Sequence, residues 1–216
     1  MTSITVIGEN IIPEINIALN LMECRKDNPA YNQLQGLFLE EHSRVCELIK
    51  PRAAFKLLEE CSEKYFEMYP GLYPGLYSGE RIISLMTLGS DISSYIDECT
   101  KKDLMRGLLV GFMADSCLFE FEKQVNQKIR EYLLKMNRGV SRILEPSKHL
   151  PTEYQKIICD KLDAHNKLGV SLTKGYMLNP IKSMSKVYVI SGDVNEFNTT
   201  HDCNNCMIKC PLKSGK

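Results

Sequence analysis

Three cysteines near the C-terminus have the spacing of a metal or cluster site. The segment CNNCMIKCP separates Cys203 from Cys206 by two residues and Cys206 from Cys210 by three, and a proline follows. Two intervening residues let both sulfurs reach one ion within a single turn, and the third thiolate closes the site. His201 as a fourth ligand would suit tetrahedral zinc, whereas an open or partner-supplied position would suit a [4Fe-4S] cluster. We predict a metal at these thiols and leave three alternatives open, namely iron–sulfur, zinc, or a tail of unliganded thiols.

The remaining reactive side chains do not form a catalytic pattern. The histidines at 42, 149 and 165 are isolated, and no Ser-His-Asp order, phosphate-binding glycine loop or HExxH motif accompanies them. Scattered single cysteines in segments with helix or strand patterns are usually buried, reduced thiols. Six cysteines fit that description: Cys24, Cys46, Cys61, Cys99, Cys117 and Cys159. We therefore predict no catalytic residue and leave open whether the protein is an enzyme.

Composition and charge exclude several classes of protein. Basic and acidic residues balance at 27 each without a long block of either sign, so no nucleic-acid or anionic-membrane surface is predicted. No run approaches the roughly 18 apolar residues that span a bilayer, and no basic flank precedes the hydrophobic part of the N-terminus. These features predict a cytoplasmic protein without a membrane segment.

The elements that must position these residues alternate irregularly. Apolar spacing predicts a short helix after Pro13 and further helices over 31–49, 90–99, 102–137 and 151–167. Strands are expected over 52–59, 81–88 and 140–144, and from the Asn179-Pro180 turn to residue 190. Gly107 and Gly111, four residues apart, predict close helix packing. The repeat YPGLYPGLY at 69–77 predicts a turn-rich loop whose tyrosines cover the core, with a ligand lid as the alternative.

Long helices mixed with strands, without a regular strand–helix repeat, predict an α+β fold with a twisted, mainly antiparallel sheet. We expect one domain over residues 1–192, whose first 60 residues are the least defined, and a cysteine-containing tail over 193–216.

Residues 172–188, LTKGYMLNPIKSMSKVY, resemble the closing segment of the activation domain of cobalamin-dependent methionine synthase. That family reads Leu-Thr-x-Ser-x-x-Met-x-Pro-x-x-Ser-Val-Ser-x-x-Tyr. The positions that agree in order and spacing are Leu172, Thr173, Pro180, Ser183, Ser185 and Tyr188. Thr87-Leu88-Gly89 matches a strand–turn junction of the family's stand-alone members, and Asp115 matches an Asp of their long helix. Similar C-terminal cysteine groups also occur in those members.

The resemblance implies S-adenosylmethionine binding beside a corrinoid. The family's ligand signature, Arg-x-x-x-Gly-Tyr-Pro, corresponds to Arg142 and the residues after it, so the implied ligand residues are Arg142, Leu144, Pro146, Ser147 and Tyr188. A planar guanidinium holds a carboxylate through two charge-assisted hydrogen bonds. Arg142 is therefore expected to bind the methionyl carboxylate of the ligand. A stand-alone domain of this kind would dock on a corrinoid protein or a cobalamin-dependent methyltransferase and support its reductive methylation. Cys203, Cys206 and Cys210 would hold a cluster that relays the required electron.

Two departures from the family leave a second hypothesis open. Pro146-Ser147 replaces the family's Gly-Tyr pair, which removes a backbone donor, and Phe119 stands where an acidic ligand contact is expected. The alternative is a non-enzymatic metal- or cluster-containing adaptor that keeps the fold and has lost S-adenosylmethionine binding.

Overall fold

A five-stranded antiparallel sheet forms the centre of the molecule. The computed structural model describes residues 3–58 and 79–198. The strands are β1 (Ile4–Ile7), β2 (Arg52–Leu58), β3 (Arg81–Thr87), β4 (Gly139–Leu144) and β7 (Ser183–Ser191). Their order across the sheet is β1-β2-β3-β7-β4, and every neighbouring pair is antiparallel. The α+β fold with a mainly antiparallel sheet is thus confirmed.

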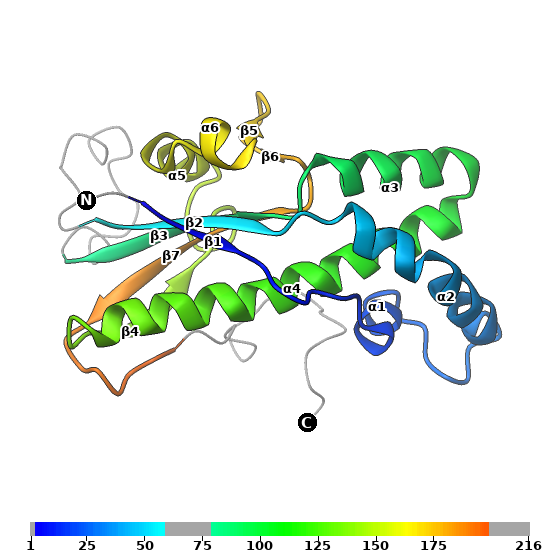
Figure 1. The fold of residues 1–216 in the computed structure, drawn as a ribbon, viewed down its shortest axis with the longest axis horizontal. Helices are drawn as coiled ribbons and strands as arrows, with labels where there is room; N and C mark the ends of the chain where they lie inside the picture. The colour runs from blue at the N-terminus through cyan, green and yellow to red at the C-terminus, as the bar shows by residue number, and fades with distance from the viewer. Residues whose placement is uncertain (1–2, 59–78, 199–216) are drawn as a thin grey trace.

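Helices cover both faces of this sheet (Figure 1). The long helix α4 (Leu104–Leu134) crosses one face, and α1 (Ile15–Leu21), α2 (Tyr31–Leu48) and α3 (Ser90–Lys102) pack against it. The short helices α5 (Tyr154–Leu162) and α6 (Ala164–Leu168) lie on the other face. A two-stranded hairpin of β5 (Ser171–Leu172) and β6 (Leu178–Asn179) follows α6 and leads into β7.

Alternation along the central strand β3 divides the core into two parts. Every residue of β3 is buried. Ile82 and Met86 pack in the cluster shared with α4, whereas Ile83 and Leu85 pack in the cluster shared with α5 and α6. Successive side chains of a strand point to opposite faces, so a continuous apolar run signals a strand covered on both sides.

Most predicted elements are present, and the main differences concern β1, the helix after residue 151 and the long helix. β1 was not predicted; it pairs with β2 at the edge of the sheet. The helix expected over 151–167 is divided at Asp163, whose left-handed φ of 54° interrupts the backbone hydrogen-bond ladder. The long helix is shorter than expected at both ends: Asp103 caps its start by accepting hydrogen bonds from the amides of Met105 and Arg106, and Asn137, with a left-handed φ of 54°, follows its last turn. The tyrosine-rich repeat at 69–77 lies outside the described residues.

The boundary between domain and tail is not a break in structure. Beyond β7, the amide of Val140 donates to the Glu196 carbonyl at 2.7 Å, and the Asn198 amide donates to the Val140 carbonyl at 2.9 Å. A Cβ on Gly139 would lie 2.0 Å from the Asp193 carbonyl oxygen, so the small residue permits this contact. Residues 193–198 therefore lie against β4, and the metal-site thiols fall outside the described part of the chain.

Gly107 allows α3 and α4 to approach closely, as predicted. A Cβ at this position would lie 2.2 Å from the Thr100 hydroxyl oxygen. Gly111 does not share this role, since its nearest neighbour would be the Lys182 ammonium at 3.9 Å.

A buried carboxylate joins the three helices at the end of the molecule remote from β4. The Glu41 side chain on α2 is 5% exposed; it pairs with Arg106 of α4 and accepts a 2.6 Å hydrogen bond from the Tyr95 hydroxyl of α3. Arg106 also pairs with the exposed Glu40 at 2.9 Å. Burial, with the neighbouring Glu41 carboxylate, raises the pKa of Tyr95 and keeps the phenol protonated as a donor. We call Glu41, Tyr95 and Arg106 the helical cluster.

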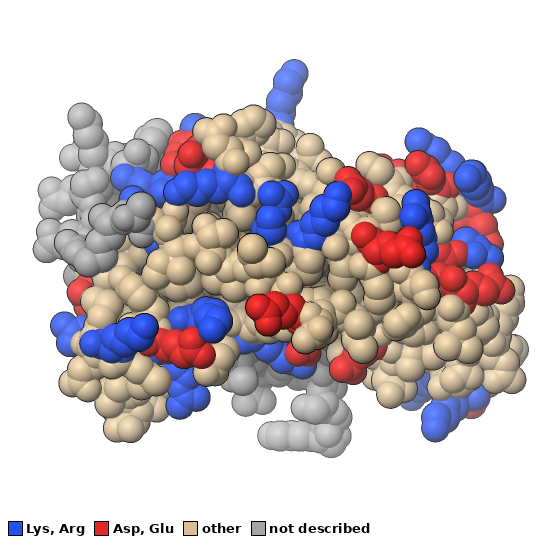
Figure 2. Space-filling view, viewed as in Figure 1, with Lys and Arg blue, Asp and Glu red and all other residues tan. Residues whose placement is uncertain are grey.

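Five of the six scattered cysteines lie in the described residues; all five are free, and all except Cys46 are buried. Burial raises the pKa of Cys117 to about 12 and that of Cys159 to about 11, which suppresses the reactive thiolate. In the described part of the chain, no helix is long and apolar enough to cross a membrane. Figure 2 shows both signs of charge interspersed over one face of the molecule.

Candidate ligand-binding groove

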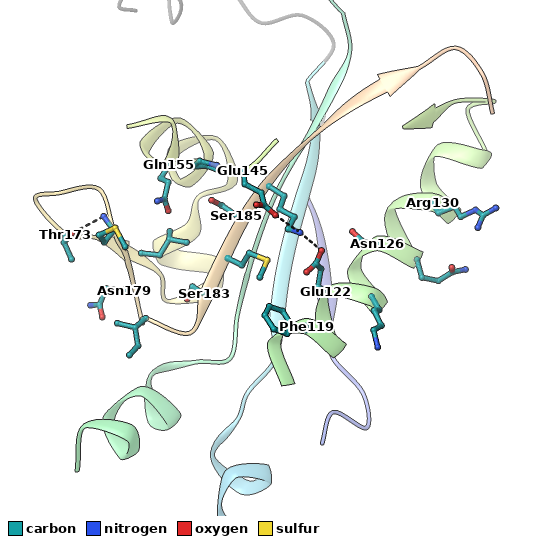
Figure 3. Close-up of a pocket in the computed structure, with 18 of the residues that line it drawn as sticks. Phe119, Glu122, Asn126, Arg130, Glu145, Gln155, Thr173, Asn179, Ser183 and Ser185 are labelled. Atoms are coloured by element: carbon teal, nitrogen blue, oxygen red, sulfur yellow. Dashed lines mark hydrogen bonds and ion pairs between the residues drawn. The ribbon is translucent and has the colours of Figure 1, made fainter. Parts of the chain in front are cut away.

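A groove of about 1010 Å³ lies between α4, the start of β7 and the β5–β6 hairpin. Figure 3 shows polar side chains from all three elements around this space, with Glu122 and Asn126 on α4 facing Ser183 and Ser185 on β7. Glu145 and Pro146, which follow β4, and Gln155 on α5 complete the wall. Its volume is at the upper end of the range for small-molecule sites.

The wall on α4 follows from the period of the helix. Residues three and four apart share one helix face. The residues of α4 that line the groove have this spacing: Phe119, Glu122, Lys123, Asn126, Gln127 and Arg130. Apart from Phe119, this face is polar, although the helix lies against the sheet. A polar stripe on a long helix with an otherwise apolar inner side was the sequence signal that would have indicated these residues.

The hairpin supplies the apolar part of the wall. Met177 and Ile181 line the groove and are 60% and 58% exposed, respectively. Such exposure of large apolar side chains is common when they belong to a binding surface. On the opposite side, the Arg130 guanidinium lies 5.2 Å from the ring centre of Phe197, which also lines the groove.

A buried lysine bridges two carboxylates at the centre of the groove. The Lys186 ammonium pairs with Glu122 of α4, and its distance to the Glu145 carboxylate is 3.2 Å. Lys148 approaches the other oxygen of Glu145 at 3.3 Å. Burial alone would raise the pKa of Glu145, but the charges of Lys186 and Lys148 outweigh it and lower that pKa. We call Lys186, Glu122 and Glu145 the groove cluster.

The residues that the resemblance assigned to the ligand are divided between groove, core and surface. Pro146 lines the groove. Leu144 is buried in the core beneath α5, and Ser147 is exposed with a left-handed φ of 67°. Arg142 is exposed and does not contribute to the groove wall.

A shift of register in β4 accounts for the position of Arg142. The pairing of β4 with β7 is irregular between Val140 and Arg142. Val140 and Ile143 both pack on the α4 side, although they are an odd number of positions apart, and Leu144 packs on the α5 side. A bulge reverses the alternation of side chains beyond it, so Arg142 has the parity of Leu144 and points away from α4.

Tyr188 is part of the core and reaches the groove through another residue. Its side chain is fully buried on the α4 face of the sheet, and burial raises the pKa of the phenol. The hydroxyl donates a 2.7 Å hydrogen bond to the Asn126 side-chain oxygen. Because Asn126 lines the groove, Tyr188 fixes the orientation of a groove residue.

The other matches with the family lie near the start of β7. The Lys182 ammonium is 2.8 Å from Asp115, and the Ser183 hydroxyl donates to Thr87 at 2.8 Å. Asp115 does not line the groove, whereas Phe119, one turn later, does. The matching segments therefore meet in space.

The described residues hold no candidate metal site. Within residues 3–58 and 79–198, no three His, Cys, Asp or Glu side chains gather closely enough to bind an ion. The metal predicted at Cys203, Cys206 and Cys210 concerns residues outside this part and stays a prediction.

Comparison with known proteins supports the fold. No protein-family model matches the sequence, and no curated protein matches it. Among solved structures, the chain is similar to the MetH reactivation domain bound to AdoHcy (S-adenosylhomocysteine), with a TM-score of 0.58 and 14% identity. The match covers 88% of this chain and 78% of that one. At this identity, the likeness establishes that the chain has the fold of that reactivation domain.

Proposed function

We propose that the groove binds S-adenosylmethionine. The observation that carries this proposal is the shared fold with a domain solved with AdoHcy bound, in a chain whose own groove is large enough for a small-molecule ligand. The matching segment around Ser183 and Ser185 contributes to the groove wall, which supports the same assignment.

The groove offers a partner for each part of the ligand. Glu122 and Glu145 would lie near the sulfonium and the α-amino group, since a carboxylate stabilises a nearby positive charge. The apolar side chains of Phe119, Met177 and Ile181 would contact the adenine. Arg130 and Lys123 of α4 are the groove cations that would hold the carboxylate, in place of Arg142, which the resemblance assigned to it and which lies outside the groove.

The second part of the proposal concerns a corrinoid partner. This chain would present a bound sulfonium to a corrinoid protein, and the reduced corrinoid would supply the nucleophile and the electron pair for methyl transfer, with the C–S pair left on sulfur. This chain would contribute positioning and exclusion of water. Exposed Met177 and Ile181 at the rim of the groove would form part of the contact with that protein.

The third part concerns the C-terminal thiols. We propose that Cys203, Cys206 and Cys210 bind an iron–sulfur cluster or zinc, on the basis of their spacing. Metal and acid-labile sulfide analysis of anaerobically purified protein separates the two, because zinc gives neither sulfide nor visible absorption. Cys206→Ser should lower the bound metal, and protein without either metal would contradict this part.

Calorimetric titration of the full chain with S-adenosylmethionine and AdoHcy tests the ligand. Glu122→Gln should weaken S-adenosylmethionine binding by about tenfold or more, because a charge-assisted contact contributes roughly 1.5–3 kcal/mol. The matched control is Glu131→Gln, on the same helix, whose carboxylate pairs with Lys128; neither residue lines the groove. Absence of binding at millimolar ligand would contradict the proposal.

The burial of Tyr188 and the exposure of Arg142 favour a second candidate. Neither residue lies where it could contact a ligand in the groove directly: Tyr188 is in the core and Arg142 is on the surface. An adaptor that keeps the fold and docks on the corrinoid protein without binding S-adenosylmethionine would fit these positions. It predicts no heat of binding with either ligand, together with retained binding to the corrinoid protein in pull-down experiments.

A further inference from the structure

We infer that Lys186 is a built-in counter-cation that competes with the positive charge of a bound ligand for Glu122. Lys186 would thereby set the preference of the groove between cationic and neutral ligands. This inference rests on the proposed function and adds to it a device that controls selectivity at the same site.

The geometry places the ammonium of Lys186 where a ligand cation would otherwise lie. The Lys186 side chain is 4% exposed, although it lines a groove, and Glu122 is 16% exposed. Figure 3 shows Glu122 and Glu145 approaching the same ammonium from α4 and from the end of β4. A buried lysine normally needs such partners, because burial removes the hydration of the ammonium and only an opposite charge compensates for that loss.

The two carboxylates differ in how much positive charge surrounds them. Glu145 is paired with Lys186 and with Lys148, whereas Glu122 is paired with Lys186. If a ligand cation takes Glu122, Lys186 keeps Glu145 as its partner, so no charge is left buried alone. Glu122 is therefore the carboxylate with which a ligand cation can pair.

If a ligand cation replaces Lys186 as the partner of Glu122, the affinity of the groove depends on the charge of the ligand. S-adenosylmethionine carries a permanent sulfonium, whereas AdoHcy carries a neutral thioether and is otherwise the same around the amino acid and the nucleoside. Their affinity ratio isolates the sulfonium charge. In the native protein, Lys186 already neutralises part of the negative charge, which reduces the advantage of the sulfonium.

Replacing the lysine should therefore increase the preference for the sulfonium. In Lys186→Gln and Lys186→Met at about pH 8, well above ordinary carboxyl pKa values, both carboxylates lack this counter-charge. We expect the ratio of the AdoHcy Kd to the S-adenosylmethionine Kd to rise by about tenfold, equivalent to about 1.4 kcal/mol. The matched control is Lys182→Gln, whose lysine pairs with Asp115 outside the groove, and its ratio should stay unchanged.

Other outcomes would overturn the inference. Equal weakening of both ligands would mean that Lys186 itself contacts them, which leaves the proposed function intact. If the Lys186 variants fail to fold by circular dichroism, Glu122→Gln decides, because removing the contested carboxylate should lower the same ratio; an unchanged ratio would contradict the inference.

Failure of the proposed function gives a separate result. If the native protein binds neither nucleoside, trimethylsulfonium becomes the probe, followed by NMR in the native protein and in Lys186→Gln. Stronger binding of this cation to the variant would support the counter-cation role without the nucleoside. Equal or absent binding in both proteins would remove the inference as well.

Discussion

The helical cluster and the groove cluster have similar chemistry and opposite surroundings. Each pairs a largely buried carboxylate with a cation: Glu41 with Arg106 in one, and Glu122 with Lys186 in the other. The helical cluster is closed by three packed helices, and Tyr95 supplies a second hydrogen bond to Glu41. The groove cluster opens onto a cavity of about 1010 Å³.

This difference separates a structural ion pair from one suited to binding. An arginine with a tyrosine satisfies the Glu41 carboxylate in fixed directions, so the cluster holds the helices together. A lysine is a compact charge on a flexible stem, and it can exchange one carboxylate for another. The groove cluster therefore has the properties of a site that a ligand enters.

The largest expected effect is the loss of the helical cluster. Glu41→Ala leaves the Tyr95 hydroxyl without its buried acceptor, whereas Arg106 is 32% exposed and keeps Glu40, so we expect a loss of about 1–3 kcal/mol. Urea unfolding measures the loss, and calorimetry of the folded fraction should give an unchanged ligand Kd. Glu40→Ala is the control, because this carboxylate is 60% exposed and such pairs contribute at most about 1 kcal/mol. Similar losses in both variants would contradict the distinction between buried and exposed partners.

An intermediate effect is expected where the core meets the groove. Tyr188→Phe removes the hydrogen bond to Asn126 and should lower the free energy of unfolding by about 0.5–1.5 kcal/mol. Because Asn126 loses its orientation, the ligand Kd should increase by about threefold, whereas loss of a direct contact would cost more than tenfold. Unfolding and titration of the same sample measure both effects. A change in Kd without a change in stability would assign Tyr188 to the ligand itself.

The groove cluster should also appear in the pH dependence of stability. The folded-state pKa of Glu145 is lowered from its ordinary value of 4.5, so the folded protein binds this proton less tightly than the unfolded chain. The resulting stability is present above about pH 4.5 and is lost as the pH falls through the folded-state value. In urea unfolding, Glu145→Gln should therefore differ from the native protein more at neutral pH than in acid. If the difference in unfolding free energy between the two proteins instead grew in acid, the lowered pKa of Glu145 would be contradicted.

The smallest effect is expected at the surface. Arg142→Ala removes an exposed side chain outside the groove, and we expect the ligand Kd to change by less than about threefold. Titration of this variant beside Glu122→Gln measures it. A loss of about tenfold or more would instead support the carboxylate contact that the sequence resemblance assigned to Arg142.

The extent of prediction from sequence differed between the fold and the groove. The α+β class followed from local patterns: the apolar period that gave α2 and α4, and the continuous apolar run that gave β3. Such signals depend on neighbours in the chain. β1 was missed because a four-residue strand carries little pattern, and the division at Asp163 depends on a single left-handed residue.

The candidate site was less accessible to sequence reasoning. The resemblance led to Pro146 and to the serines of β7, which line the groove. It also led to Arg142 and Tyr188, whose side chains lie on the surface and in the core. Strand pairing decides which face a side chain occupies, and a single irregular residue in β4 is enough to reverse it.

The sequence by itself therefore determined most of the elements, their order and the α+β fold class, because local periodicity carries that information. Only the tertiary structure brought Glu122, Glu145 and Lys186 together from α4, the end of β4 and β7, with Lys186 and Glu122 separated by 64 residues. The reason is physical: the charge around a side chain depends on what packs against it in space. The packing of α4 across β7 made these three ordinary charged residues into one cluster at the centre of a groove.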